Sequence, residues 1–369
     1  MYQEDKFKMM FSSNIDDILQ KLEAFNPSNY AASRNYHNGS VSYLSPYISR
    51  GVISTKVVFN HVKSLDIPWY TIKKFVQELA WRDYWQQLWN SLDIDKPIKQ
   101  TQFPVRSNEV PQAILHQNTG ILAVDQALKS LTESGYMHNH MRMYVASICC
   151  NYANCDWLSS SKWMFSQLLD GDQGSNQLSW QWVAGSNSNK KYYANQQNIN
   201  KFFNSTQTGT FLDVPYEAFP LKEIPECLSK TSKHQTQTKL PQSTFSKLTN
   251  GKKTLIYNYY NLDPFWHKNE KYQRVLLLEP SFFKDNPVNK NCINFALQLA
   301  QNIDDIIVFS GEFNQLQKHI PESTIIYKQH PTVKHYIGSE ESRDWLSNVE
   351  GVYSSFFKFW NKAEKQLKF

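Results

Sequence analysis

The stretch from residue 136 to residue 182 constrains this chain most, because it sets polar side chains inside aromatic, apolar sequence of helical character. Asn139, Arg142 and Met143 are spaced i, i+3 and i+4, so one face of a helix would carry all three. Burying an unpaired guanidinium in a helical bundle costs several kcal/mol, on the order of the penalty for burying an ion. Arg142 therefore needs an acidic partner, and the nearest acids in the sequence are Asp156, Asp170 and Asp172. A large, flat, polar ligand would explain the remaining polar groups.

Two interpretations of this stretch compete. In the first, it belongs to a helical bundle in which Asp170, Gly171 and Asp172 form a surface turn and the aromatic residues fill the core. In the second, the whole string is functional. It reads M-H-N-x-x-R-M, an apolar helix, D-W, and then S-Q-L-x-D-G-D-x-x-x-N-x-x-x-W-Q-W without a gap. This string resembles the FAD-binding domain of the photolyase/cryptochrome family, and its length and unusual chemistry favour the second interpretation.

The composition fits a globular protein of two domains, since the chain has 369 residues and 41% of them are hydrophobic. A net charge of +6 is compatible with phosphate-bearing partners, but solubility alone explains it equally well. The five cysteines lack the spacing of a zinc site or a disulfide framework, so we expect no metal and a reducing, cytoplasmic location. Residues 1–11 lack the apolar core of a signal peptide, and no apolar run is long enough to span a membrane.

Hydrophobic periodicity predicts helices early in the chain and short strands after residue 253. Helices are expected over residues 13–25, 71–92, 120–131, 289–303 and 356–368, and β-rich runs begin at residues 254, 274, 304 and 324. We therefore expect a multidomain α and α/β protein: an all-α domain over residues 1–225, a mobile basic linker over 226–253, and a small α/β domain with a mostly parallel sheet over 254–369. The last domain resembles the antenna domain of photolyases, where it precedes the flavin domain.

A polar loop at residues 38–42 leads into a predicted helix that starts at Ser45 and Pro46, with Ser45 as the N-cap. Unpaired N–H groups and the helix dipole at such a terminus favour a phosphate, although an ordinary capped turn has the same sequence features. The segment resembles the family string T-S-x-L-S-P-Y-L-x-x-G-x-I-S, which holds the pyrophosphate of FAD. By that resemblance, Tyr30 lies beside the flavin, and the phosphate contacts fall on Val41, Ser42, Leu44 and Ser45.

The predicted helix over residues 71–92 also mixes charge and aromatic rings on one face. Glu78 and Arg82, spaced i, i+4, form either a surface pair worth roughly a few tenths of a kcal/mol or part of a site. The face resembles the family string W-x-x-E-x-x-W-R, in which the acid bonds the damaged base, the Trp stacks on it and the Arg meets DNA. The resemblance implies that Glu78, Trp81 and Arg82 line the substrate pocket, and that Phe75 is an aromatic wall of the cofactor site.

The resemblance also assigns roles around the flavin. Arg142 and Asp170 would pair beside the ring and stabilise its reduced, negatively charged form, and Asp172 would contact its polar edge or the ribityl region. Asn176 would face N5 of the flavin, where an amide can either donate or accept a hydrogen bond. The residues that would pass electrons inward to photoreduce the flavin are Trp157 and Trp180.

DNA contacts follow from the same resemblance. Photolyases extrude the damaged dinucleotide from the duplex. Trp81 and Trp182 would stack on the extruded bases, a contribution of ~1–3 kcal/mol per base. The remaining substrate contacts fall on Glu78, Arg82, Asn139, His140 and Met143.

Departures from the family weaken the expected DNA contact. His140 and Asn195 stand where photolyases carry DNA-contacting Arg residues, and no outer relay Trp lies near Phe103. Each lost Arg lowers the salt-dependent phosphate contribution, so we expect damaged DNA to bind more weakly than to typical photolyases. The leading hypothesis is FAD-dependent, blue-light-driven repair of cyclobutane pyrimidine dimers by a monomer. The alternatives are a cryptochrome-like photoreceptor without repair activity and a helical protein that has lost its cofactor; a second, antenna chromophore is left open.

Overall fold

The computed structural model describes residues 11–244, 248–321 and 324–369, and the chain divides into two compact units. The sheet unit comprises Met1–Pro27, Ser42–Asn90 and Thr236–Phe369; the helical unit comprises Ser28–Val41 and Ser91–Gln235. These units differ from the predicted domains, because residues 11–27 and 42–90 group with the sheet that follows residue 253. The predicted domain boundaries at residues 225 and 253 stay predictions. Residues 1–10, most of the segment without a signal-peptide pattern, lie outside the described residues. Within the described ranges, no helix combines the length and apolar character that crossing a membrane requires.

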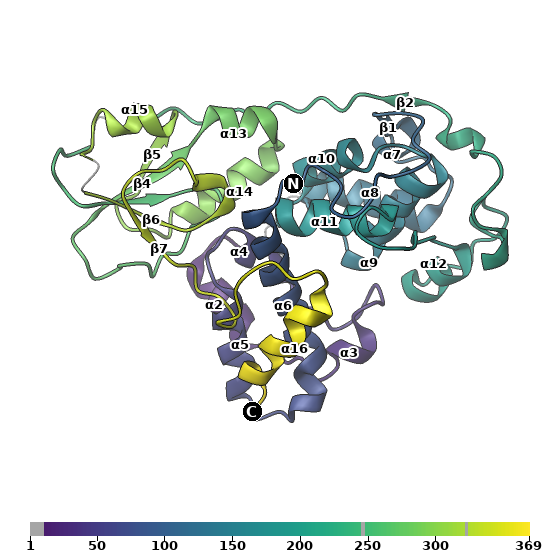
Figure 1. The fold of residues 1–369 in the computed structure, drawn as a ribbon, viewed down its shortest axis with the longest axis horizontal. Helices are drawn as coiled ribbons and strands as arrows, with labels where there is room; N and C mark the ends of the chain where they lie inside the picture. Colours follow the sequence, from purple (N-terminus) through teal and green to yellow (C-terminus); the bar gives the residue numbers. More distant parts are fainter. Residues whose placement is uncertain (1–10, 245–247, 322–323) are drawn as a thin grey trace. The chain divides into compact units, whose positions relative to one another are not determined.

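The helical unit is built from helices around one apolar core (Figure 1). They are α3 (Tyr30–Ser33), α7 (Gln112–Leu115), α8 (Leu122–Ser134), α9 (Asn139–Ser147), α10 (Trp157–Gln167), α11 (Gln173–Ala184) and α12 (Gln196–Phe203). A π-helical turn, Ile148–Tyr152, continues α9, and short 3-10 turns occur at Tyr216–Ala218 and Glu226–Leu228. The core contains Leu128, Met141, Trp157, Met164 and Trp180.

The turn between α8 and α9 shows why this part of the chain reverses where it does. α8 ends at Gly135, whose φ of +70° is a left-handed conformation that glycine adopts without strain. A Cβ at this position would lie 2.7 Å from Cγ of Leu169, so the position has no room for a side chain either. Leu169 in turn donates its backbone N–H to Gly135 O at 2.9 Å. The start of α9 is thereby held beside the segment that joins α10 to α11.

The sheet unit combines a five-stranded sheet with helices from both ends of the chain (Figure 1). Its helices are α2 (Ile15–Glu23), α4 (Ser45–Ser49), α5 (Thr55–Ser64), α6 (Trp69–Ser91), α13 (Pro280–Asp285), α14 (Lys290–Ala300), α15 (Phe313–Gln317) and α16 (Phe356–Leu367). A 3-10 turn spans Pro331–Val333. The strands are β3 (Thr254–Tyr257), β4 (Gln273–Leu278), β5 (Ile307–Ser310), β6 (Ile325–Lys328) and β7 (Ser339–Glu341).

The strands pair in the order β5-β4-β3-β6-β7, and every neighbouring pair is parallel. The predicted parallel sheet is confirmed, together with the helical region before it. After β3, the chain adds β4 and β5 on one side of that strand and then returns to add β6 and β7 on the other side. The direction in which strands are added therefore reverses between β3 and β6. Crevices at such a reversal commonly bind ligands in α/β proteins. Here the hollow at the carboxyl ends of β3 and β4 measures only about 20 Å³, because aromatic residues such as Tyr259, Phe282 and Tyr336 line it.

α16 begins at Phe356, as predicted, and packs its apolar face on α6 (Figure 1). The ring of Phe356 stacks on Trp81 at 3.6 Å with an interplanar angle of 9°, and Trp360 stacks on Trp69 at 6.5 Å. Phe359 lies 5.6 Å from Tyr84. The sequence pattern predicted an amphipathic helix here but gave no sign that the aromatic residues of α6 would cover its apolar side.

The predicted linker, 226–253, makes more contacts than its composition suggests. β1 (Val110–Pro111) pairs antiparallel with β2 (Thr231–Ser232) in the helical unit. In the sheet unit, the backbone N–H of Thr244 donates to Val308 O at 2.8 Å, and Ser310 N donates to Ser243 Oγ at 2.8 Å. The described part of this segment is therefore hydrogen-bonded to both units, whereas its composition predicted a mobile chain; residues 245–247 lie outside the described residues.

Candidate functional site

Arg142 of α9 and Asp170, in the turn before α11, form an ion pair in the helical unit. Nη2 of Arg142 donates to Oδ2 of Asp170 at 3.0 Å, and its Nε donates to Met137 O at 2.8 Å. The Arg142 side chain is 19% exposed and that of Asp170 only 5%, so solvent screens the pair weakly. Two hydrogen bonds in different directions fix the plane of the guanidinium group.

The other two acids near Arg142 in the sequence have helix-capping roles. Asp156 accepts from the backbone N–H of Ser159 at 2.9 Å and caps α10. Asp172 accepts from the backbone N–H of Ser175 at 2.7 Å and caps α11. Of the three acids left open by the sequence, Asp170 is therefore the one that pairs with Arg142.

Asn176 lies in the first turns of α11 with its amide fixed in orientation. Its Nδ2 donates to Ser161 O, on α10, at 2.9 Å. In the part of the chain that the structure describes, Oδ1 of Asn176 accepts no hydrogen bond. The amide oxygen of Asn176 is thus the group that could accept a hydrogen bond from a ligand. The sequence left open whether this amide donates to a ligand or accepts from it, and the structure favours acceptance.

The residues on the predicted substrate face of α9 differ in how exposed they are to solvent. Asn139 is exposed, and Met143 and Arg142 are half-buried on the same face. Trp182 is 40% exposed and lies 5.9 Å from the ring of Tyr192. The two predicted relay residues, Trp157 and Trp180, are buried within one apolar core.

His140 does not supply the positive charge of the Arg that it replaces. Its Nδ1 lies 3.1 Å from Asn35 O, and burial lowers its pKa, so the ring is neutral at pH 7. The neighbouring His138 is buried too; burial lowers its pKa to about 4, and its Nδ1 accepts from His140 N at 3.2 Å to cap α9. Asn195 caps α12 by accepting from Asn198 N at 2.9 Å, so the second substituted position has a structural role.

The predicted residues of α6 are engaged within the sheet unit. Glu78 pairs with Lys74 at 3.0 Å, and Nη1 of Arg82 donates to Ser49 Oγ at 2.7 Å. The ring of Trp81 is covered on one side by Phe356 of α16. Phe75 is buried, with its ring 4.8 Å from Phe25. Sequence reasoning missed Phe356, and the amphipathic pattern of α16 was the only signal that could have found it.

The segment expected to hold phosphate is a hydrogen-bonded turn. Val41 N donates to Gly39 O at 2.9 Å, and Leu44 N donates to Ser42 Oγ at 3.3 Å. Leu44 is fully buried, and it occupies the N-cap position of α4. The expectation that Ser45 is the N-cap is wrong: Ser45 is the first helical residue, because the turn at Tyr43, with φ of +55°, starts the helix one residue earlier.

Site residues predicted by resemblance fall in both units. Those in the helical unit are Tyr30, Val41, Asn139, His140, Arg142, Met143, Trp157, Asp170, Asp172, Asn176, Trp180 and Trp182. Those in the sheet unit are Ser42, Leu44, Ser45, Phe75, Glu78, Trp81 and Arg82. The structure brings Arg142 and Asp170 into contact; the functional roles of all these residues stay predictions.

Several known proteins resemble this chain. The deoxyribodipyrimidine photo-lyase of Agrobacterium fabrum is 34% identical over 40% of this chain and 32% of that protein. The photo-lyase of Alkalihalophilus pseudofirmus is 27% identical over 46% of this chain and 37% of that protein. The crystal structure of a class III photolyase from Agrobacterium tumefaciens covers 50% of this chain and 42% of its own, with 28% identity and a TM-score of 0.42. The chain thus spans about a third of the length of these curated relatives.

The family comparison covers more of the sequence than either curated relative. The family described as the FAD binding domain of DNA photolyase matches residues 75–263, which include α6 from Phe75 onward, the Arg142–Asp170 pair and the first strand of the sheet. This match takes in just over half of the 369 residues. The chain therefore belongs to the photolyase/cryptochrome family, through the FAD-binding domain of DNA photolyase.

Proposed function

We propose that this protein binds FAD and uses blue light to transfer an electron to a cyclobutane pyrimidine dimer in DNA. The observation that carries the proposal is the Arg142–Asp170 ion pair, at 3.0 Å and largely buried, inside the string that carries the family resemblance. Support comes also from the curated relatives, which bear the name deoxyribodipyrimidine photo-lyase. Since the chain spans only part of their length, their activity is carried to this protein as a proposal.

The residues of the helical unit fit a flavin by their chemistry. A planar guanidinium held by Asp170 and Met137 O offers its remaining N–H groups to carbonyl oxygens of a flat ring. The accepting Oδ1 of Asn176 suits an N–H of the ring, and its orientation is fixed by Ser161. When bound, FAD supplies light absorption and electron donation, whereas the protein supplies binding, orientation and charge. The Arg142 charge favours a ring that carries negative charge.

One side of the Trp81 ring is covered by Phe356 of α16. A base can stack on the covered side of that ring only after Phe356 has left it. An aromatic pair contributes ~0.5–1.5 kcal/mol beyond its buried area, whereas a stacked base contributes ~1–3 kcal/mol. Because the figure for the aromatic pair leaves out the burial of Phe356, which adds ~1.5–3 kcal/mol, the exchange of Phe356 for a base is at best balanced, even when the rest of α16 stays on α6. In the proposed repair reaction, displacement of the Phe356 ring is thus a step that opposes substrate binding.

A second candidate is a photoreceptor that reduces its flavin in light but repairs no lesion. The stack of Phe356 on Trp81 favours it, because the predicted lesion-stacking ring is already covered. The neutral His140 favours it as well, since it removes one positive charge from the predicted DNA contact.

The deciding experiment measures flavin and repair on the same preparation. Purified protein, reconstituted with FAD and reduced, is illuminated at 450 nm with an oligonucleotide that contains one thymine dimer. Flavin absorbance with light-dependent repair supports the first candidate. Flavin that is photoreduced without repair supports the second, and a colourless protein that does not take up FAD contradicts both.

Two variants make this test specific to the ion pair. Arg142→Ala is expected to lower the amount of bound FAD at least tenfold. Lys162→Ala is the matched control, because Lys162 pairs with Asp95 at 2.8 Å in the same unit but at a more exposed place. Equal FAD content in the two variants would remove the Arg142–Asp170 pair from the proposed cofactor site.

A further inference from the structure

α16 carries two faces of opposite character. Its buried face consists of Phe356, Phe359, Trp360, Ala363 and Leu367, which supply the apolar side of the helix that packs against α6. On the other side, exposed lysines recur at spacings of four, three and three residues: Lys358, Lys362, Lys365 and Lys368. We call these four residues the lysine row. α16 lies outside the residues that match the family, so the resemblance assigns no role to the row.

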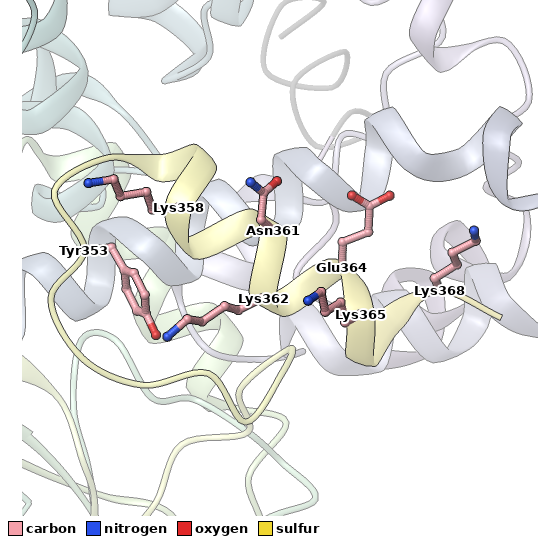
Figure 2. A pocket seen from close by; sticks show the side chains of 7 residues that line it. All are labelled: Tyr353, Lys358, Asn361, Lys362, Glu364, Lys365 and Lys368. Atoms are coloured by element: carbon pink, nitrogen blue, oxygen red, sulfur yellow. The ribbon is translucent and has the colours of Figure 1, made fainter.

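The lysine row lines a shallow hollow of about 820 Å³ (Figure 2). The remaining lining residues are Tyr353, Asn361 and Glu364. Figure 2 shows the four lysines distributed along the length of the helix, with Tyr353 beside its first half. Nζ of Lys362 lies 5.0 Å from the centre of the Tyr353 ring.

The charge of this hollow is strongly one-sided. Glu364 is its single acid, and Nζ of Lys73 already lies 2.7 Å from its Oε1, with Nε1 of Trp69 at 3.3 Å. Over the described ranges, no carboxylate lies within ion-pair distance of any lysine in the row. Four positive charges are therefore left to attract an anionic partner, while the acid nearest to them is neutralised by a fifth lysine.

The spacing of the row suits a repeated anion. Lys358 and Lys368 are ten residues apart, which is about 15 Å along a helix that rises ~1.5 Å per residue. Duplex DNA carries one negative charge for every ~1.7 Å of its axis, both strands counted, so a row of that length faces enough phosphates for each of its four lysines. Lysines act as point charges that position a backbone without reading bases. A lipid surface fits less well, because α16 has already buried its apolar face against α6 and cannot insert it.

We propose that the lysine row binds the phosphate backbone of duplex DNA, independently of base sequence and of damage. The choice of DNA as the anion rests on the proposed function. The inference that the lysine row binds an anion does not rest on the proposed function, because α16 lies outside both the family match and the predicted flavin contacts. The lysine row would add affinity for DNA phosphates, and so would partly offset the absence of Arg at positions 140 and 195.

The test measures dark binding of undamaged duplex. A fluorescein-labelled 20-base-pair duplex is titrated with the full chain at KCl concentrations from 50 to 300 mM, and anisotropy gives Kd at each. In the row variant, Lys358, Lys362, Lys365 and Lys368 are changed to Glu. In the control variant, four exposed lysines of the same unit, Lys271, Lys284, Lys290 and Lys318, are changed to Glu, so that the net charge is equal.

The expected result is a smaller salt dependence in the row variant alone. Each phosphate contact contributes roughly 0.9 to the slope of log Kd against log [KCl], so the slope falls by about 3 to 4 and Kd at 100 mM KCl rises more than tenfold. The control variant is expected to keep the wild-type slope within about 1. Equal changes in both variants, or no change in either, would overturn the proposal.

Three further measurements keep the outcome interpretable. A second row variant with Gln at the four positions should show the same fall in slope, and it takes over the test if charge reversal prevents folding. Binding of phosphatidylserine vesicles that is lost in the row variant, while DNA binding is kept, would contradict the choice of partner. Flavin absorbance and repair are recorded on each preparation. A protein without flavin that keeps the row-dependent slope contradicts the proposed function but not this inference.

Discussion

The α9–α11 region and α6 teach different lessons, although both carry charges among aromatic residues. On α9, the Arg142 charge finds its partner at Asp170, within the same short stretch of sequence. On α6, the ring of Trp81 finds its partner at Phe356, on a helix near the far end of the chain. The first arrangement could be derived from a local string. The second depends on which distant element the fold delivers to α6, and it covers the ring to which resemblance assigned the substrate.

The largest expected difference between these regions is the dependence of the helical unit on its ion pair. Asp170→Ala leaves the guanidinium of Arg142, 19% exposed, without its carboxylate. We expect a loss of ~3–5 kcal/mol in the free energy of unfolding, the usual cost of breaking a buried pair from one side. Urea unfolding followed by circular dichroism measures it. Lys162→Ala, which breaks a more exposed pair, should cost less than ~1 kcal/mol, and similar losses in the two variants would contradict this account.

The next effect concerns the pH dependence of the sheet unit. Asp83 is buried, and burial raises its pKa to about 6, although the backbone N–H of Leu346, the Arg343 charge and Thr55 oppose the shift. Because the folded pKa lies above the unfolded value of ~3.9, the contribution is fully present below pH 4 and is lost as pH rises through 6. The loss is about 3 kcal/mol. Urea unfolding at pH 4.5, 6 and 7.5 gives the free energy of unfolding, which should fall with rising pH in the wild type but not in Asp83→Asn. A variant that shows the same fall as the wild type would contradict the assignment to Asp83.

The helical unit should show the opposite pH dependence. Burial lowers the pKa of His138 from 6.5 to about 4, so its contribution is present above pH 6.5 and is lost as pH falls through 4. The expected loss is about 3 kcal/mol. His138→Asn keeps an acceptor at the N-cap of α9 and removes the titrating ring. Amide hydrogen exchange in α9 is measured over this pH range, corrected for intrinsic rates and compared with exchange in α6. In the wild type, the protection of α9 should fall as the pH is lowered, whereas in His138→Asn it should not change with pH.

The smallest effect tests whether α16 competes with substrate. Phe356→Leu keeps an apolar side chain on Trp81 but removes the stacked ring, at a cost of roughly 1–2 kcal/mol in stability. Dimer-containing DNA should then bind about 2- to 10-fold more tightly, because the stack no longer has to be broken. Phe359→Leu is the matched control, since its ring contacts Tyr84 on the same pair of helices. An equal gain in affinity in the control would show that loosening of α16, not uncovering of Trp81, is responsible.

Much of the fold was predictable from periodicity. Helices expected over residues 71–92 and 120–131 are α6 (Trp69–Ser91) and α8 (Leu122–Ser134). An apolar stripe marks α8, whereas buried residues lie all round α6 and its length marked it instead. Four β-rich runs each contain a strand of the parallel sheet. β7 was not predicted, since it is three residues long and largely exposed and has no apolar pattern to reveal it.

The candidate site was predictable only where its contacts are local. The need of Arg142 for an acid followed from the cost of burying its charge, but sequence could not choose among three acids. The choice depended on helix capping, which commits Asp156 and Asp172 to the N-termini of α10 and α11. The cover over Trp81 and the engagement of Arg82 by Ser49 come from tertiary packing, which periodicity does not encode.

The filled crevice at the carboxyl ends of β3 and β4 has a consequence for how the proposed reaction would be driven. Its volume of about 20 Å³ is far below the ~300–1,000 Å³ of pockets that enclose an organic ligand. An organic ligand of that size has no room at this edge while these aromatic side chains stay where they are. If the proposed repair occurs, an action spectrum broader than the absorption of reduced FAD would therefore indicate a pigment held at another place in the molecule.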